Sequence, residues 1–372
     1  MSKQEKETLF TTDTQQIVLQ LTTDVEDNRP IYVAGNFNNW KAADELFRLT
    51  KIAAGKYQFV FPKDFHPSDA IEYKYTKGDW KNVELCKFGI TPDNRILKPN
   101  EKRIDRVPRW MNNGKAYQDK FLPKIKVISK DFEIPQLVKT RRIAALLPHD
   151  YDNSNKTYPV LYLQDGQNLF DDYAPFGNWG VDKKLAVLAE LGLGDIIVIA
   201  IDHAEHERIE EFTPTQKTKL GTGDGKKYVR FLADTLKPYV DKHFRTKRDQ
   251  ANTGIGGSSM GALISIYAGF MYPEVYSKLM IFSPALWVAP NIRFGSINYD
   301  ADINMQIYLY AGGHESENMI PNVQRFKETV LQKGTEDSKI DFELVIDPKG
   351  QHNEDRWGKE FPRAIEWLFG DV

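Results

Sequence analysis

Three segments in the last two thirds of the chain are apolar at almost every position: PVLYLQ (159–164), IIVIAID (196–202) and QIYLYAG (306–312). A strand with one face in water alternates apolar and polar residues, whereas a strand covered by helices on both faces is apolar throughout. Longer stretches with helical spacing separate the three runs, as in residues 227–240. This order predicts an α/β domain with a mostly parallel sheet.

The first quarter of the chain has a different pattern. Its apolar residues alternate with polar ones in short segments bounded by turn-rich pieces, namely QIVLQL (16–21), IYVAGNF (31–37), YQFVF (57–61) and IEYKYT (71–76). This pattern predicts a small β-sandwich of the immunoglobulin-like kind. The polar segment that follows contains Pro108 and the turn-forming Asn-Asn-Gly at 112–114. We therefore predict a sandwich over residues 1–98, a linker over 99–121 and the α/β domain over 122–372.

Composition excludes several classes of partner. The chain has 50 basic and 52 acidic residues and a formal charge of −2, so no electrostatic attraction to nucleic acid or an anionic membrane is expected. Its single cysteine excludes an intrachain disulfide and a metal site built from several thiolates. The N-terminus lacks the apolar core of a signal peptide, and no later stretch is long enough to span a membrane. We expect a cytoplasmic protein, unless the sequence was trimmed from a secreted one.

A candidate nucleophile lies in GIGGSSMGALIS (254–265). A serine at the end of a parallel strand needs a sharp turn into the next helix, with glycines two residues before and after it for clearance. Ser259 has Gly257 and Gly261 at these positions, whereas Ser258 has Met260 at the second. A strand-like segment precedes the motif and an apolar helical segment follows it. Ser259 is therefore the predicted nucleophile.

The order nucleophile, acid, histidine limits the choice of base, because only His314 and His352 follow Ser259. His352 lies between the last apolar strand and the final helix, so it is the predicted base. The acid is expected just after the preceding strand, where Glu315 is the first carboxylate. Glu317, two residues later, is the alternative. His314 is expected to line the pocket or lie on the surface.

An oxyanion hole requires two converging backbone N–H groups. One is expected from Met260, which follows the nucleophile, and the other from Gly166 or Gln167 after the first apolar run. Trp179 and Trp287 are candidate walls of a pocket for an aromatic acyl group or a sugar ring. Either ring could instead fill the core.

The segment DHAEHE (202–207) resembles a metal site, because His203 and His206 alternate there with carboxylates. No third histidine has an evident place beside them, so a solvated polar loop is favoured. We predict neither a metal nor another cofactor.

The last two thirds of the chain, about residues 122–370, resemble the esterase family of α/β-hydrolases that includes feruloyl, acetyl xylan and ferric enterobactin esterases. The stretches that carry the resemblance are RRIAALLPHDYDNSNKTYPVLYLQDGQNLF, HERIEEFTP, GIGGSSMGALISIYAGFMYPEVY and FSPALW. It implies an α/β-hydrolase fold without a large lid and a triad on Ser259, Glu315 and His352. Asp165 stands where many relatives have histidine, and Ala262 where a glycine is frequent.

The first domain is similar to starch- and glycogen-binding modules through VAGNFNNW, YKYTKGDWKNVE and DNRIL. The resemblance implies sugar contacts at Trp40, Lys74 and Trp80. Alternatively, these aromatic residues belong to a sandwich that packs on the catalytic domain and shapes its cleft.

Together these features predict a serine carboxylic-ester hydrolase that works through an acyl-enzyme. Acetyl or feruloyl esters of carbohydrates are the expected substrates. A siderophore trilactone esterase and an acyltransferase with the same triad are the alternatives.

Overall fold

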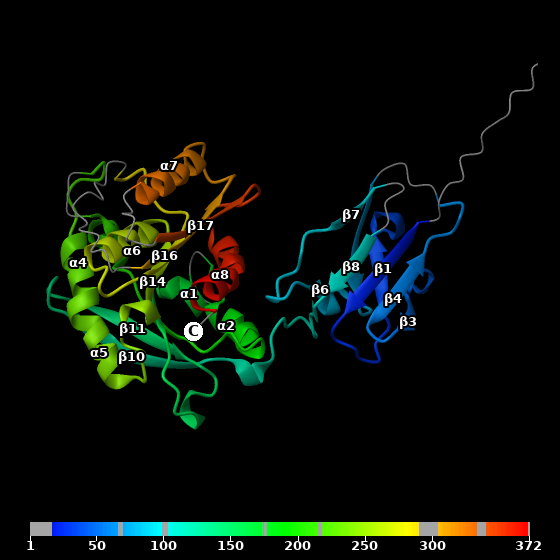
Figure 1. Cartoon of the computed structure of the whole chain (residues 1–372), viewed down its shortest axis with the longest axis horizontal. Helices are drawn as coiled ribbons and strands as arrows, with labels where there is room; N and C mark the ends of the chain where they lie inside the picture. The colour runs from blue at the N-terminus through cyan, green and yellow to red at the C-terminus, as the bar shows by residue number, and fades with distance from the viewer. Residues whose placement is uncertain are drawn as a thin grey trace, which may run out of the picture. The chain divides into compact units, whose positions relative to one another are not determined.

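The apolar runs form inner strands of an eight-stranded sheet with the order β10-β11-β13-β12-β14-β15-β16-β17 (Figure 1). Every residue of β12, β13 and β15 is buried, as expected for strands covered on both faces. Among the described strands of this sheet, only β10–β11 and β11–β13 pair antiparallel, so the predicted α/β-hydrolase sheet is confirmed. The strands are β10 (Lys124–Ile134), β11 (Lys139–Leu147), β12 (Val160–Gln164), β13 (Ile197–Ile201), β14 (Thr253–Ser258), β15 (Lys278–Phe282), β16 (Met305–Gly312) and β17 (Ile340–Asp347).

The computed structural model describes residues 17–65, 70–98, 103–172, 174, 177–214, 218–289, 304–332 and 340–370. It divides into two units, Met1–Ala116 and Tyr117–Val372. In its described part, no helix combines the length and apolar character needed to cross a membrane.

Helices cover the sheet of the second unit (Figure 1). They are α1 (Gln167–Phe170), α2 (Val181–Glu190), α3 (Arg208–Phe212), α4 (Gly225–Phe231), α5 (Lys237–His243), α6 (Met260–Met271), α7 (Met319–Leu331) and α8 (Glu354–Phe369). The predicted helix over 227–240 is interrupted by a π turn at Leu232–Leu236. The turn lies just before Pro238, which has no N–H to continue the ladder of hydrogen bonds.

The first unit is the predicted β-rich domain, with a four-stranded sheet β3-β4-β1-β8, a three-stranded sheet β2-β5-β7 and the pair β6-β9. Leu19, Val33, Phe61 and Leu97 are fully buried in its core. The strands are β1 (Val18–Thr23), β2 (Tyr32–Gly35), β3 (Thr50–Ala53), β4 (Lys56–Val60), β5 (Ile71–Thr76), β6 (Glu84–Leu85), β7 (Arg95–Leu97), β8 (Arg103–Val107) and β9 (Arg109–Trp110).

The predicted linker began too early, because residues 103–110 form β8 and β9 of this first unit. β8 pairs parallel with β1, and β9 pairs with β6. The sequence pattern did not indicate β8, because a charged residue, Asp105, occupies one of its buried positions. The first unit therefore extends to Ala116.

Asp105 is buried with a full set of partners. Its Oδ2 atom accepts hydrogen bonds from the hydroxyls of Tyr73 and Tyr75 at 2.7 and 2.9 Å. Its Oδ1 atom accepts one from Arg95 at 2.7 Å, and Arg95 also pairs with buried Glu84 at 2.6 Å. Burial and the nearby Asp105 carboxylate raise the pKa of both tyrosines. This network joins β5, β6, β7 and β8.

Replacing Asp105 with Asn should lower the free energy of unfolding of the first unit by about 3 kcal/mol, because Arg95 and the two tyrosines lose a buried charged partner. Asp24→Asn is the control, since it breaks an exposed pair with Arg106 and should cost less than about 1 kcal/mol. Urea denaturation followed by tryptophan fluorescence measures both. Equal losses in the two variants would contradict a structural role for the network.

Candidate active site

Ser259 occupies a strained turn between β14 and α6. Its backbone angles are φ +54° and ψ −119°, a region that residues other than glycine rarely adopt. Its N–H donates to the carbonyl of Phe282 at the end of β15, at 3.0 Å. Ser259 is partly exposed, whereas Ser258 is buried at 6% exposure. The turn thus presents Ser259, rather than Ser258, at the carboxyl edge of the sheet.

The two glycines around Ser259 are required by close packing. A Cβ atom at Gly257 would lie 3.0 Å from the carbonyl carbon of Gly261. A Cβ atom at Gly261 would lie 2.7 Å from Oδ2 of Asp165. Side chains at either position would therefore push the turn away from the end of β12.

Glu315 and His352 are brought together from the loops after β16 and β17. Nδ1 of His352 lies 2.7 Å from Oε2 of Glu315, whose side chain is 1% exposed. The other Glu315 oxygen accepts hydrogen bonds from the N–H of Gly312 and the hydroxyl of Ser283, both at 2.6 Å. Of the two carboxylates that the sequence left open, Glu315 bonds the histidine, while Glu317 is exposed.

Glycines also allow the acid loop and the histidine loop to touch. A Cβ atom at Gly312 would lie 2.5 Å from the carbonyl carbon of Gly350. His314 is exposed, as one of its two expected placements required, and its N–H donates to the Gly350 carbonyl at 2.9 Å. These contacts fix the distance between the loops that carry Glu315 and His352.

Sequence reasoning missed two residues behind this pair, Ser283 and Trp357. The Ser283 hydroxyl bonds Glu315 and accepts a hydrogen bond from the indole N–H of Trp357 at 2.9 Å. The Trp357 ring meets the His352 ring nearly edge-on, with centroids 4.9 Å apart and planes at 85°. Ser283 lies in the FSPALW stretch noted for its resemblance, but nothing in that stretch indicates a bond to a glutamate 32 residues later.

Of the three predicted oxyanion donors, one already has a hydrogen-bond partner and two remain candidates. The N–H of Gly166 donates to the carbonyl of Ile201 at 2.8 Å, so Gly166 cannot be the second donor, and that prediction is wrong. Gln167 and Met260 each occupy the first position of a helix, α1 and α6, where amides have no partner within the helix. These two amides are the remaining candidates.

Two further titratable groups of the second unit, Glu354 and His203, have shifted pKa values, and His352 interacts electrostatically with the first of them. Glu354, at the start of α8, is half-buried, and burial raises the pKa of its carboxyl group. Oε1 of Glu354 lies 3.5 Å from the amide nitrogen of Asn168. Burial also lowers the pKa of His203 on the loop after β13.

The two tryptophans predicted as pocket walls differ in exposure. Trp179 is 3% exposed and stacks on Phe282 with ring centroids 5.3 Å apart, so it fills the core and does not line an open pocket. Trp287 is 49% exposed and can be reached from solvent. A wall made by Trp287 stays a prediction.

Several side chains of the 202–207 loop have partners within the protein. Asp202 pairs with Arg142 at 3.2 Å, and Nδ1 of His203 accepts the N–H of Glu205 at 2.8 Å. Over the described ranges, no group of three or more histidine, cysteine or acidic residues is arranged to hold a metal ion.

In the first unit, Trp40 and Trp80 form a pair with ring centroids 6.2 Å apart and planes at 45°. Trp80 is 43% exposed and Trp40 is partly exposed. The ammonium group of Lys74 bonds the backbone carbonyl of Pro92, and burial lowers its pKa. The structure thus brings the two predicted rings together and gives Lys74 another partner.

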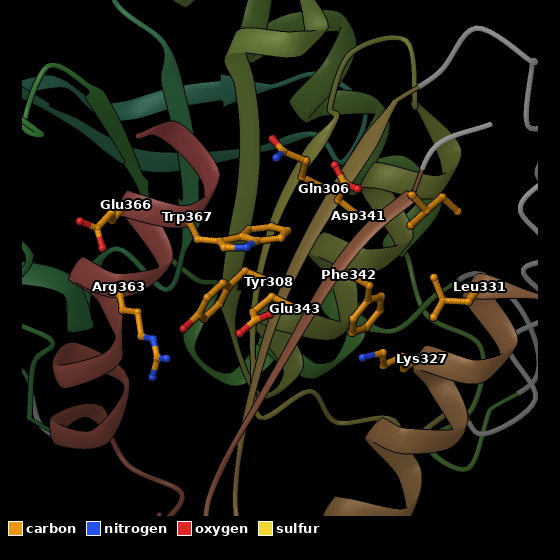
Figure 2. Close-up of a pocket in the computed structure, with 11 residues that line it drawn as sticks. Gln306, Tyr308, Lys327, Leu331, Asp341, Phe342, Glu343, Arg363, Glu366 and Trp367 are labelled. Carbon is orange, nitrogen blue, oxygen red and sulfur yellow. The ribbon is translucent and has the colours of Figure 1, made fainter. Parts of the chain in front are cut away.

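A cavity of about 830 Å³ lies elsewhere on the second unit, beside Tyr308, Phe342 and Trp367 (Figure 2). Its strand residues come from the first halves of β16 and β17. Glu315 and His352 follow the last residues of the same parallel strands. The cavity is therefore at the other end of the sheet from the candidate active site.

A family model described as "Putative esterase" matches residues 135–368, nearly two thirds of the chain. The chain belongs to this esterase family. It is thus a member of the serine esterases with the α/β-hydrolase fold, in agreement with the turn at Ser259.

Individual relatives extend this result. The chain is 24% identical over 247 residues to the uncharacterized protein YbbA of Bacillus subtilis, covering 62% of this chain and 93% of the relative. The enterobactin esterase of Shigella flexneri has a similar fold over 92% of this chain and 89% of its own, with a TM-score of 0.50 and 15% identity. An alpha-amylase of Niallia circulans is 38% identical over 72 residues, which are 19% of this chain and 5% of the amylase.

Glu315→Gln should lower kcat for ester hydrolysis by about 10³- to 10⁴-fold, because an amide can favour the wrong histidine tautomer and cannot stabilise the imidazolium. Glu317→Gln is the matched control and should be nearly silent, since Glu317 is exposed. Steady-state hydrolysis of p-nitrophenyl acetate compares the two. The reverse ranking would place the acid two residues later.

Proposed function

We propose that this esterase cleaves carboxylic esters through an acyl-enzyme on Ser259, with His352 as the base and Glu315 as the acid that orients it. The supporting observation is the bond of 2.7 Å between Glu315 and His352 at the sheet edge where the strained turn presents Ser259. Because Nδ1 of His352 faces Glu315, its Nε2 atom is left to take the proton of Ser259 and to give it to the leaving alcohol.

The reaction then takes two halves. Oγ of Ser259 attacks the ester carbonyl while its proton passes to Nε2 of His352. The oxyanion that forms accepts hydrogen bonds from the backbone N–H groups of Met260 and Gln167. His352 gives the proton to the leaving alcohol as the C–O bond breaks. Water attacks the acyl-enzyme with His352 as base, which releases the acid and restores the Ser259 hydroxyl.

Acetyl or feruloyl esters of carbohydrates are the proposed substrates. The support comes from the first unit, where the exposed Trp80 ring and the partly exposed Trp40 ring offer apolar faces of the kind on which sugar rings stack. One segment of the chain is similar to part of an alpha-amylase, which agrees with the descent of that segment from a protein that acts on starch. A module that holds a glycan would keep its acyl groups near an esterase in the same chain.

Two alternatives use the same triad. A siderophore trilactone esterase is favoured by the similar fold of the Shigella flexneri enterobactin esterase, which extends over both units of this chain. An acyltransferase would pass the acyl group to a sugar hydroxyl in place of water. Faster release of the first product when a sugar acceptor is added would identify the transferase.

A hydrolysis panel separates these substrate classes. The panel compares p-nitrophenyl acetate, methyl ferulate, acetylated xylo-oligosaccharides and an enterobactin-type trilactone, and we expect the highest kcat/KM for an acylated carbohydrate or ferulate. Ser259→Ala should abolish turnover of every substrate, because it removes the nucleophile and little packing. Ser258→Ala is the matched control and should retain most activity. A clear preference for the trilactone would exclude the carbohydrate-ester proposal.

Sugar binding by the first unit is tested separately. Trp40→Ala and Trp80→Ala in the full chain should each weaken binding of maltooligosaccharides or xylooligosaccharides by at least about 10-fold, because each removes one stacking face. Leu46→Ala is the control, since Leu46 is 82% exposed in the same unit. Isothermal titration calorimetry gives the affinities. An absence of binding to the unaltered protein at millimolar sugar would instead favour a packing role.

A further inference from the structure

The end of β15 and the residues after it bond two members of the proposed triad. The Phe282 carbonyl accepts the N–H of Ser259 at 3.0 Å, and the N–H of Ala285 donates to the Ser259 carbonyl at 3.1 Å. Ser283, which lies between them in the chain, donates its hydroxyl to the carboxylate of Glu315 at 2.6 Å. One short segment therefore connects the backbone of the nucleophile with the side chain of the acid.

Ser283 is held in an unfavourable backbone conformation. Its φ is +47°, in the left-handed region that residues other than glycine adopt at a cost in free energy. The residue is fully buried, and its N–H donates to the carbonyl of Tyr310 on β16 at 2.7 Å. Such strain is concentrated at functional sites, which directs attention to the Ser283 hydroxyl.

The hydrogen bonds of this hydroxyl can run in only one direction. The indole N–H of Trp357 can only donate, and it lies 2.9 Å from Oγ of Ser283. The ionised carboxylate of Glu315 can only accept. Ser283 therefore accepts from Trp357 and gives its own proton to Glu315. Trp357 thus fixes the rotation of the Ser283 hydroxyl toward the acid.

The bond from Ser283 controls the orientation of the carboxylate. Oε1 of Glu315 accepts this bond and a second one from the N–H of Gly312, also at 2.6 Å. The other oxygen, Oε2, then faces Nδ1 of His352 at 2.7 Å. Because the Glu315 side chain is 1% exposed, solvent offers little to replace a donor that is lost.

We propose that Ser283 and Trp357 are positioning residues that hold Glu315 in the orientation in which it aligns His352. The proposal rests on the function proposed above. Both residues are buried, at 0 and 4% exposure, so they act on the reaction through Glu315 and not through the substrate. A triad acid contributes by holding the imidazole in the correct tautomer and orientation, which requires that the acid itself is held.

The test removes the hydroxyl and the indole donor separately and together. Ser283→Ala deletes the hydroxyl, and Trp357→Phe keeps an aromatic ring beside His352 but has no N–H to donate. The double variant combines the two changes. Trp367→Phe is the control, because it removes an indole from the same helix, α8, beside the cavity at the other end of the sheet.

With p-nitrophenyl acetate, Ser283→Ala should lower kcat by about 10- to 100-fold and change KM by less than about 3-fold, because only the alignment of the triad is lost. Trp357→Phe should lower kcat by about 3- to 10-fold, since the hydroxyl is then free to rotate. In the Ser283→Ala background the same change should cost less than about 2-fold, because Trp357 has no hydroxyl left to direct. Trp367→Phe should keep kcat near that of the unaltered protein.

Two kinetic results would overturn the proposal. Losses that multiply in the double variant would show that Trp357 does not act through Ser283. A loss in Trp367→Phe as large as that in Trp357→Phe would show only a general need for indole rings in α8.

A spectroscopic readout does not depend on turnover. The Nδ1 proton between His352 and Glu315 should give a far-downfield proton NMR resonance, identified by its absence in His352→Ala. Ser283→Ala should move this resonance upfield or broaden it beyond detection, while Trp367→Phe should leave it in place. A resonance unchanged by Ser283→Ala would contradict the positioning role.

The outcomes separate this proposal from the function on which it rests. If the unaltered protein hydrolyses none of the esters, the proposed function fails, and the NMR resonance alone then decides whether Ser283 positions Glu315. If Ser283→Ala does not fold, Trp357→Phe decides. A kcat and a resonance in that variant equal to those of the unaltered protein would overturn the proposal, and a lower kcat with a shifted resonance would support it.

Discussion

The strained backbone at Ser259 is the constraint on which the site depends. A residue other than glycine at φ +54° is unfavourable, and it persists only where the surrounding packing allows no other path for the chain. Here Gly257 and Gly261 bring the turn against the end of β12, and the N–H of Ser259 is bonded to β15. The same close approach places the Asp165 carboxylate against the start of α6. The unfavourable backbone conformation of this turn lowers stability, and the same conformation exposes the Ser259 hydroxyl at the edge of the sheet.

Much of the fold and part of the site could be predicted from the sequence, because their signals are local. Continuous apolar runs identify strands buried on both faces, and glycines at fixed distances from Ser259 identify the turn. Chain order then left His352 as the better base and two candidate acids. Only the folded loops show that Glu315 bonds His352 and that Glu317 does not take its place.

The features that the sequence did not indicate depend on residues far apart in the chain. Ser283, directly after β15, bonds Glu315 and is itself bonded by Trp357 of α8, and the bond between Gly166 and Ile201 joins two neighbouring strand ends. In the first unit, the sequence of β8 looks polar because it contains Asp105. This residue can be buried because it is bonded to partners on other strands. A polar residue in a core position is recognisable only when its partners are known.

The central claim is that Ser259 carries the covalent step. Treating the full chain with a fluorophosphonate, digesting it and sequencing the peptide that contains residues 254–265 by mass spectrometry tests this directly. The account predicts a single phosphonate adduct on Ser259, formed much more slowly in His352→Ala because the base that removes the hydroxyl proton is lost. An adduct on Ser258, or labelling at Ser259 that proceeds equally fast without His352, would contradict it.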